Sequence, residues 1–193
     1  MSELERAALL IVDLQNDFCP GGALAVADAD RIIPVVNGLV KFFGSRDLPI
    51  LLSRDWHPQK HCSFRGQGGS WPPHCIRGSM GAKFPEELEL PEKYEIISKA
   101  VEQEKDAYSA FQDTGLKDLL IEKDVQTLYV CGLATDVCVK DTVLDALREG
   151  FSVYVITDAV KGVNLSPNDS RTALEAMSSA GAELIDSLEI LSL

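Results

Sequence analysis

Cys138 is the residue whose type and position most directly suggest a catalytic role. It lies in the stretch GLATDVCV, between an apolar run and an amphipathic run that begins KDTVLDAL. We expect the amphipathic run to form a helix with Cys138 in its first turn, where unpaired backbone N–H groups and the helix dipole would lower the pKa of the thiol. Such a thiol could act as a nucleophile, although a lone cysteine is also commonly a small hydrophobic residue of the core.

A cysteine nucleophile needs a base, and the three histidines all lie far from Cys138 in the sequence. Asp13 is the candidate base, and Lys99 is its candidate partner, because each follows or ends an apolar run. An ammonium group near Asp13 would keep that carboxyl ionised and would stabilise a neighbouring thiolate. Each residue also has an ordinary interpretation, since Asp13 could cap a turn and Lys99 could be a solvated strand end.

A second group of polar residues lies in the stretches DWHPQKHCSF and SWPPHC. Asp55 and His57 are two residues apart, so an extended chain points both side chains the same way, and His74 could meet them from a proline-stiffened turn. A carboxylate with two imidazoles suits Zn²⁺, Fe²⁺ or Mn²⁺ and leaves positions open for water or substrate. The alternative is that these histidines only form hydrogen bonds within a loop. His61 could be a further ligand, a group that supports a ligand, or a solvated residue.

The pattern of the whole chain predicts a scaffold for these residues. Short apolar runs alternate with amphipathic runs in a βαβ order. Because most of the strand segments are apolar on both faces, we expect an α/β fold, a three-layer αβα sandwich around a six-stranded, mostly parallel sheet. The expected strands are 7–14, 48–55, 94–100, 125–132, 151–159 and 182–186.

Four helices are expected between the strands. The apolar residues that recur at helical spacing are Ile32, Val35, Val36, Leu39, Val40 and Phe43 for the first helix, Leu116, Leu119 and Leu120 for the second, and Val139, Val143, Ala146 and Leu147 for the third. The fourth helix is expected to start after Ser166 as its N-cap, with Pro167 following. Residues 56–93 carry no sustained period and are expected to form a long loop of functional importance.

The candidate residues fall at corresponding places in this scaffold. Asp13, Asp55 and Lys99 each end an expected strand, and a fourth strand delivers Cys138 through a turn at Gly132. In an open parallel sheet, ligands bind outside the carboxyl ends of the strands. We therefore expect these side chains to gather at one rim of the sheet.

Composition limits the classes of function. The 193 residues, 46% of them apolar, are expected to form one domain over 1–193, with the long loop as an insertion. A net charge of −12 opposes binding to nucleic acid and to anionic membranes. The apolar runs are too short to span a bilayer, the first residues are acidic where a signal peptide is basic, and the five cysteines form no C-x-x-C pair. We expect a cytoplasmic protein with free thiols.

Four stretches together carry a resemblance to a known family. They are VDLQNDFCPGGAL near the start, RDWHP with WPPHC in the loop, ISKA with YSAF, and VCGLATDVCV. In their order and spacing they resemble the nicotinamidases (pyrazinamidases) of the isochorismatase-like cysteine hydrolase family, nearly from end to end of the chain. The segment D-x-H with WPPHC is typical of the nicotinamidase branch.

The resemblance implies roles for single positions. Asp13, Lys99 and Cys138 match the catalytic triad of the family, and Asp55, His57 and His74 match its metal ligands. It also implies a cis peptide bond between Leu133 and Ala134, an oxyanion hole made by the N–H groups of Ala134 and Cys138, and a substrate pocket that includes Phe18, Trp71, Leu133, Ala134 and Tyr108. Some relatives add a metal-associated His or Glu in the loop; the stretch RGQGG offers no Glu, so His61 or water would take that part.

The implied activity is the hydrolysis of nicotinamide to nicotinate and ammonia through a cysteine thioester, as part of NAD salvage, with pyrazinamide also accepted. The implied cofactor is one divalent metal ion, Zn²⁺ or alternatively Fe²⁺ or Mn²⁺, which would hold the pyridine nitrogen. We also expect a homo-oligomer. The rival hypotheses are a related hydrolase of another small amide or a vinyl ether, a non-enzymatic metal- or nucleotide-binding module, and a thiol-redox protein. The missing Gly-rich phosphate loop and the missing C-x-x-C pair disfavour the last two.

Overall fold

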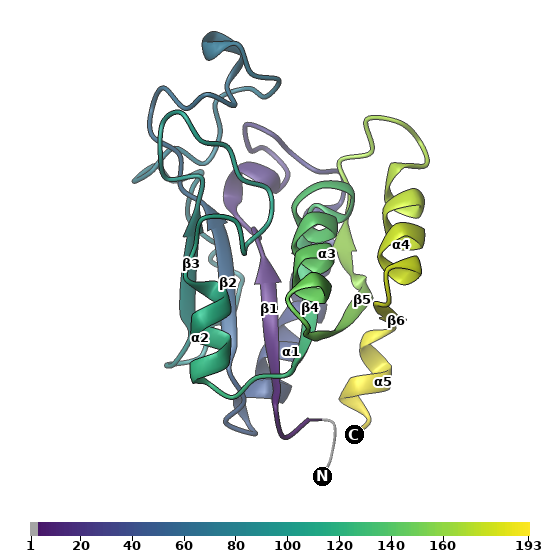
Figure 1. The fold of residues 1–193 in the computed structure, drawn as a ribbon. Helices are drawn as coiled ribbons and strands as arrows, with labels where there is room; N and C mark the ends of the chain where they lie inside the picture. The colour runs from purple at the N-terminus through teal and green to yellow at the C-terminus, as the bar shows by residue number, and fades with distance from the viewer. Residues whose placement is uncertain (1–3) are drawn as a thin grey trace.

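The computed structural model describes residues 4–193, and a sheet of six parallel strands lies at its centre (Figure 1). The strands are β1 (Ala7–Val12), β2 (Ile50–Asp55), β3 (Glu95–Lys99), β4 (Thr127–Leu133), β5 (Ser152–Lys161) and β6 (Glu183–Ile185). Their order in the sheet is β3-β2-β1-β4-β5-β6, and every neighbouring pair is parallel. The predicted strands and the α/β fold are confirmed, with the sheet parallel throughout.

Helices cover both faces of the sheet, which gives the predicted three layers (Figure 1). On β1, Leu9 and Ile11 belong to the core under the first helical layer, whereas Leu10 and Val12 belong to the core under the second. This alternation is the period of two that a strand buried on both faces requires. The first layer holds α1 (Ile33–Gly44) and α5 (Ser187–Leu191), and the second holds α2 (Leu116–Glu122), α3 (Lys140–Arg148) and α4 (Asp169–Ser179).

Two helices near the C-terminus, α4 and α5, differ from the prediction. Helix α4 begins at Asp169, so the prediction of Ser166 as its N-cap was wrong. The Ser166 N–H donates to the Asp169 carboxylate, and the Asp169 N–H donates to the Ser166 carbonyl, so the two residues close a turn ahead of the helix. The short helix α5 was not predicted, although the capping box formed by Asp186 and Glu189 is a sequence signal for a helix start.

Residues 56–93 form the predicted long loop, which contains a single 3-10 turn at Arg65–Gln67 and extends beyond the carboxyl ends of β2 and β3 (Figure 1). Two further 3-10 turns, Asn16–Phe18 and Ala29–Ile32, lie between β1 and α1. Long irregular segments therefore collect at the rim of the sheet where the candidate residues were expected.

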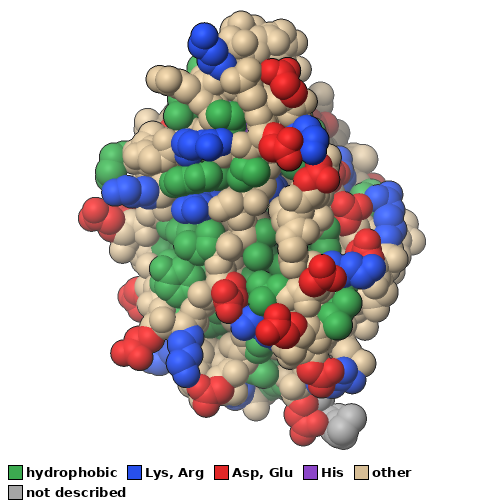
Figure 2. Space-filling view, turned by 60° about the vertical axis from the view of Figure 1, so that its left-hand side comes forward, with side chains coloured by type: hydrophobic (Ala, Val, Ile, Leu, Met, Phe, Trp, Pro, Cys, Tyr) green, Lys and Arg blue, Asp and Glu red, His purple; other side chains and the backbone are tan. Residues whose placement is uncertain are grey.

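Charged side chains of both signs are interspersed over the face drawn in Figure 2, with hydrophobic side chains exposed between them. No histidine is visible on this face, and all three are buried, with 1%, 0% and 4% exposure for His57, His61 and His74. The histidines are therefore internal groups of the fold.

None of the helices formed by residues 4–193 has the length and apolar character that crossing a membrane requires.

Replacement of Phe43 by alanine is expected to lower the free energy of unfolding by about 3–5 kcal/mol, because a cavity would remain in the core. Phe43 on α1 is 0% exposed, and its ring centroid lies 5.6 Å from that of Phe42 and 5.5 Å from that of Tyr129. Urea-induced unfolding measures the change. The control is Ile121→Ala on α2, where the side chain is 59% exposed and the change should stay within about 0.5 kcal/mol. Equal losses in the two variants would contradict the assignment of Phe43 to the core.

Candidate active site

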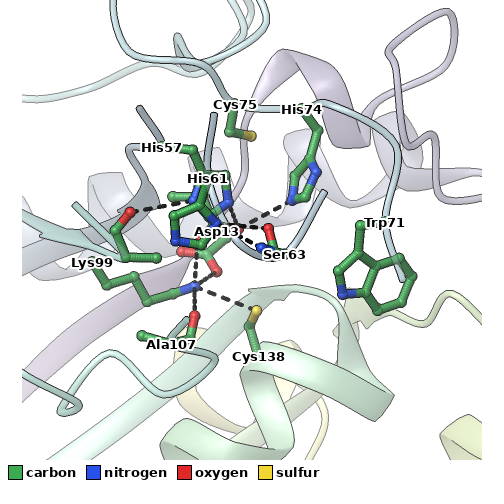
Figure 3. A network of polar contacts seen from close by, with 12 residues as sticks. Asp13, His57, His61, Ser63, Trp71, His74, Cys75, Lys99, Ala107 and Cys138 are labelled. Carbon is green, nitrogen blue, oxygen red and sulfur yellow. Dashed lines mark hydrogen bonds and ion pairs between the residues drawn. The ribbon is translucent and has the colours of Figure 1, made fainter. Parts of the chain in front are cut away.

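Three neighbouring strands place three charged side chains at one rim of the sheet, and two of them, Asp13 and Lys99, are labelled in Figure 3. Asp13 follows β1, Asp55 ends β2, and Lys99 ends β3 in direct register with Asp55. The Lys99 Nζ lies 3.0 Å from Asp13 Oδ2 and 2.5 Å from Asp55 Oδ1, and it also donates to the carbonyl of Ala107 at 3.2 Å. Lys99 thus joins two buried carboxylates that belong to different expected groups, one to the triad and one to the metal site.

Cys138 reaches the same cluster from the other side of β1. It lies in a π-helical turn, Thr135–Val139, which connects β4 to α3, so the predicted α-helix begins two residues after it. Single turns of this type are frequent at functional sites. The Cys138 Sγ lies 3.5 Å from Lys99 Nζ, and ligand atoms of Cys138, Asp13 and Asp55 lie within 4.8 Å of one another. The structure therefore brings the three predicted triad residues into contact range.

Burial raises the pKa of the Cys138 thiol, and the attraction of Lys99 only partly offsets this, while the nearby carboxylates of Asp13 and Asp55 raise it further. The pKa of Cys138 therefore lies well above its usual value. The prediction of a lowered pKa was wrong, because desolvation in a fully enclosed position outweighs the cation beside the sulfur. The raised pKa favours the protonated thiol, and its sulfur lies within 4.8 Å of a carboxylate oxygen of Asp13.

The pKa of each of the three charged groups at the rim is set by its own balance between burial and the neighbouring charges. Burial raises the pKa of Asp13, and Lys99 opposes this without cancelling it. Burial also raises the pKa of Asp55, but Lys99 and the imidazoles of His57 and His74 outweigh burial and hold it well below the usual range. Burial lowers the pKa of Lys99, and the carboxylates of Asp13 and Asp55 reverse this, so that Lys99 stays charged.

The expected metal ligands converge on one point beside this cluster. The Nε2 atoms of His57 and His74 lie 3.5 Å and 3.7 Å from Asp55 Oδ2, distances that are too long for good hydrogen bonds. The His57 Nδ1 faces the carbonyl of Ala100 at 3.3 Å, and the His74 Nδ1 faces the carbonyl of Pro72 at 2.8 Å. A carbonyl can only accept, so each Nδ1 carries a proton, and in the neutral form of each ring the Nε2 offers a lone pair to a bound ion.

The donor set fits a divalent ion. His57 Nε2 is buried and has no hydrogen-bond partner among residues 4–193, which is costly for a polar atom unless a ligand occupies its lone pair. One carboxylate and two imidazole nitrogens are ligands that Zn²⁺, Fe²⁺ and Mn²⁺ accept. The hypothesis that these histidines only form hydrogen bonds within the loop explains their Nδ1 atoms and leaves the convergence of their Nε2 atoms unexplained.

The five residues expected around the substrate line one pocket, together with Cys138 and the expected metal ligands. Trp71 lies at one side of the site in Figure 3, and its Nε1 donates to the hydroxyl of Tyr108 at 3.1 Å. Phe18 faces the ring of His74, with the centroids 5.6 Å apart. Sequence reasoning missed several residues of this lining, namely Leu24, Ser63, Asp106, Ala107, Val137 and Val163.

Comparison with known proteins places this geometry in a family. The family model described as the isochorismatase domain matches residues 7–189, which is nearly the whole chain. The chain belongs to the isochorismatase family. It is 44% identical to the nicotinamidase of Escherichia coli (strain K12), over 92% of this chain and 93% of that relative.

Two solved structures of this family have closely similar folds. A pyrazinamidase of Pyrococcus horikoshii in complex with zinc has a TM-score of 0.90 and 48% identity, over 94% of this chain and 99% of that chain. The PnC1 protein of L. infantum in complex with nicotinate has a TM-score of 0.89 and 35% identity, over 97% of this chain and 95% of that chain.

The resemblance to the isochorismatase family predicted a cis bond between Leu133 and Ala134, and the structure has it. The carbonyl of Ala134 accepts the N–H groups of Val137 and Val139 at 3.0 and 3.1 Å, which closes the turn that carries Cys138. Gly132 begins this arrangement with a φ of +110°, and a Cβ there would lie 2.1 Å from the carbonyl oxygen of Val12. Only glycine fits so close to β1 in that conformation.

His61 supports the site without pointing at it. Its Nδ1 lies 2.7 Å from the hydroxyl of Ser63, its Nε2 lies 2.8 Å from the carbonyl of Lys105, and its ring stacks on His57 with centroids 4.2 Å apart. Both ring nitrogens are therefore engaged with protein groups. The interpretation as a solvated residue was wrong, and the contacts favour a supporting role over that of a further ligand.

Ser53 is a residue of the site that sequence reasoning missed. It lies within the buried strand β2, where a small polar residue gives little signal. Its hydroxyl donates to Asp13 Oδ1 at 2.6 Å, while Lys99 faces Oδ2 of the same carboxylate. Both oxygens of Asp13 are thereby held in place beside Cys138.

Proposed function

We propose that the protein is a nicotinamidase, which hydrolyses nicotinamide to nicotinate and ammonia and also accepts pyrazinamide. The observation that carries the proposal is a single pocket in which the thiol of Cys138, beside Asp13 and Lys99, faces the convergent atoms of Asp55, His57 and His74. Relatives named as nicotinamidases support it, as do structures solved with zinc and with nicotinate.

Asp55, His57 and His74 would hold one divalent ion, with zinc as the first choice. When bound, this ion supplies a Lewis acid that takes the ring nitrogen of the substrate. The protein itself supplies an aromatic enclosure, since Phe18, Trp71 and Tyr108 line the pocket around a planar ring. Fixing the ring in this way turns its carboxamide toward Cys138 and removes the entropic cost of orienting it during the reaction.

The reaction begins with a proton transfer. A carboxylate oxygen of Asp13 lies within 4.8 Å of the Cys138 sulfur, so Asp13 takes the thiol proton as the sulfur attacks the carboxamide carbon. Lys99, 3.5 Å from the sulfur and 3.0 Å from Asp13, stays charged and stabilises the thiolate that forms. The N–H groups of Ala134 and Cys138 would hold the oxyanion, an interaction worth about 3 kcal/mol per donor.

Asp13 then returns the proton to the departing nitrogen, so that ammonia leaves and a thioester remains on Cys138. In the second half of the reaction, Asp13 takes a proton from water, the resulting hydroxide attacks the thioester carbonyl, and the proton restores the thiol. These steps consume one amide and one water and release nicotinic acid and ammonia, and the acid then gives its proton to ammonia, so that nicotinate and ammonium result.

The test is ammonia release by the zinc-loaded protein from nicotinamide, pyrazinamide and benzamide. Benzamide has the same shape as nicotinamide but lacks the ring nitrogen. We expect turnover of the first two amides and a value of kcat/KM for benzamide that is lower by at least about 100-fold, as for a misplaced substrate. No ammonia from nicotinamide would refute the proposal, and equal turnover of benzamide would refute the anchoring role of the metal site. Turnover of another small amide or a vinyl ether alone would favour the rival family activity.

Replacement of Trp71 by alanine is expected to raise KM for nicotinamide by about tenfold or more, because one wall of the pocket would be lost. Trp71 is half-buried and belongs to the loop, so the thermal midpoint should change little. Steady-state kinetics measures the effect. Tyr108→Phe is the matched variant, because it removes only the hydroxyl that Trp71 contacts and keeps the ring. An unchanged KM in Trp71→Ala would show that the substrate binds elsewhere.

A further inference from the structure

The side chain of Gln15 is fully buried two residues after Asp13, and it contacts the backbone of Asp55 on both sides. Its Oε1 accepts the N–H of Asp55 at 2.8 Å, and its Nε2 donates to the carbonyl of Asp55 at 2.9 Å. The same Nε2 donates to the carbonyl of Ala82 at 2.9 Å, in the long loop. All three hydrogen bonds of this side-chain amide are therefore made to backbone groups, and two of the three are made to Asp55.

The sheet explains why Asp55 needs this partner. Alternate residues of β2 direct their N–H and carbonyl groups toward β1, as the bonds from Leu9 N to Pro49 O at 3.0 Å and from Asp13 N to Ser53 O at 3.2 Å show. Asp55 is the next residue in this alternation, so its N–H and carbonyl groups also point toward the side on which β1 lies. At that level β1 has already turned away, because Asp13 has a φ of +45° and the Gln15 N–H folds back to the Asp13 carbonyl at 2.8 Å.

The amide of Gln15 takes the place of the missing strand. Its oxygen and nitrogen satisfy the N–H and the carbonyl of Asp55 as the peptide groups of a neighbouring strand would. On the opposite edge, the chain after Asp55 is held by the bond from Trp56 N to the carbonyl of Lys99 at 3.1 Å. Without Gln15, two buried backbone groups of Asp55 would lose their partners, and such groups are costly to leave unpaired.

We propose that Gln15 is a positioning residue that fixes the carboxylate of Asp55 between Lys99 and the imidazoles, and thereby sets the affinity of the site for a divalent ion. The inference deepens the proposed function and rests on Asp55 as a ligand. The Asp55 carboxylate has one oxygen 2.5 Å from Lys99 and the other 3.5 Å from His57. A small rotation of the Asp55 backbone would move one oxygen away from Lys99 and the other away from His57.

The test measures zinc affinity by competition with a chromophoric chelator in Gln15→Met, Gln15→Glu and the native protein. Met fills the same space without hydrogen bonds, and Glu keeps the acceptor for Asp55 N but cannot donate when ionised. Both variants should bind zinc about 10- to 100-fold more weakly, as is typical when the partner of a ligand is removed. Asn37→Leu is the matched control, because Asn37 also clamps backbone groups, Glu87 O at 2.8 Å and Glu89 N at 2.9 Å, away from the site.

Asn37→Leu should bind zinc as the native protein does, even where its thermal midpoint falls as far as that of the Gln15 variants. Native zinc affinity in a folded Gln15 variant would overturn the inference, as would a native protein that binds no zinc. If Gln15→Met does not fold, Gln15→Glu decides alone. Zinc affinity is measured without substrate, so a failure to hydrolyse nicotinamide would refute the proposed function and leave this result standing.

Discussion

Replacement of Cys138 by alanine is expected to lower kcat for ammonia release from nicotinamide by about 10⁴-fold or more, because no other group in the pocket can form the thioester. The side chain is small, and alanine removes only the sulfur, so the fold should persist. Ammonia release over long incubation measures the residual rate. Brief incubation of the native protein with substrate followed by acid quenching should show the acyl adduct by mass spectrometry, and Cys138→Ala should show none.

The matched control for this prediction is Cys62→Ala. Cys62 is half-buried in the long loop, and its Sγ lies 4.0 Å from His61 and away from the triad. This variant should retain native kcat and the acyl adduct. Activity that survives in Cys138→Ala, or that disappears in Cys62→Ala, would show that the nucleophile has been assigned to the wrong thiol.

Removal of the divalent ion proposed for Asp55, His57 and His74 is expected to lower kcat/KM for nicotinamide by at least about 100-fold, since the ring would lose its anchor while Asp13, Lys99 and Cys138 are retained. The protein is treated with a chelator, freed of the chelator by gel filtration, and analysed for metal content before the assay. Addition of Zn²⁺ should restore activity, and Fe²⁺ or Mn²⁺ tested in parallel identifies which ions the site uses.

A variant distinguishes loss of the ion from general damage by chelation. His57→Ala removes a nitrogen whose buried Nε2 has no other partner among the described residues, so it should lower zinc content and activity together. The reactivity of Cys138 toward iodoacetamide should persist in both preparations, because Asp13 and Lys99, the charged groups beside the sulfur, are retained. Full activity in protein shown to be free of metal would refute the anchoring role and would leave the cysteine chemistry in place.

The fold was largely predictable because its signals are local. Strands that are apolar on both faces, such as β1 and β4, can only be covered by helices, and their alternation with amphipathic runs indicates a parallel sheet. The convergence of Asp13, Asp55 and Lys99 then follows from topology, since each residue stands where its strand ends. The predicted N-cap of α4 was wrong by two residues, because Ser166 bonds to Asp169 and closes a turn, and Asn168 takes the N-cap position.

The parts of the site that escaped prediction depend on three-dimensional surroundings. Position in a turn suggested a lowered pKa for Cys138, but burial decides the sign, and burial is not visible in the sequence. The side chains of Ser53 and Gln15 hydrogen-bond to residues that lie 40 positions away in the sequence, for which no spacing rule exists. His61 differs from His57 only in which atoms surround it, and sequence gives both the same chemistry.

The ammonium group of Lys99 contacts the carboxylates of Asp13 and Asp55 at once, so the proposed acid–base group and the proposed metal ligand share a counter-ion. Anyone who wishes to redesign this enzyme for another metal or another leaving group therefore cannot treat the two halves as separate modules. A substitution that changes the position or pKa of one carboxylate also changes how Lys99 interacts with the other carboxylate. Substitutions at the ends of β1 and β2 should therefore be made and selected in pairs.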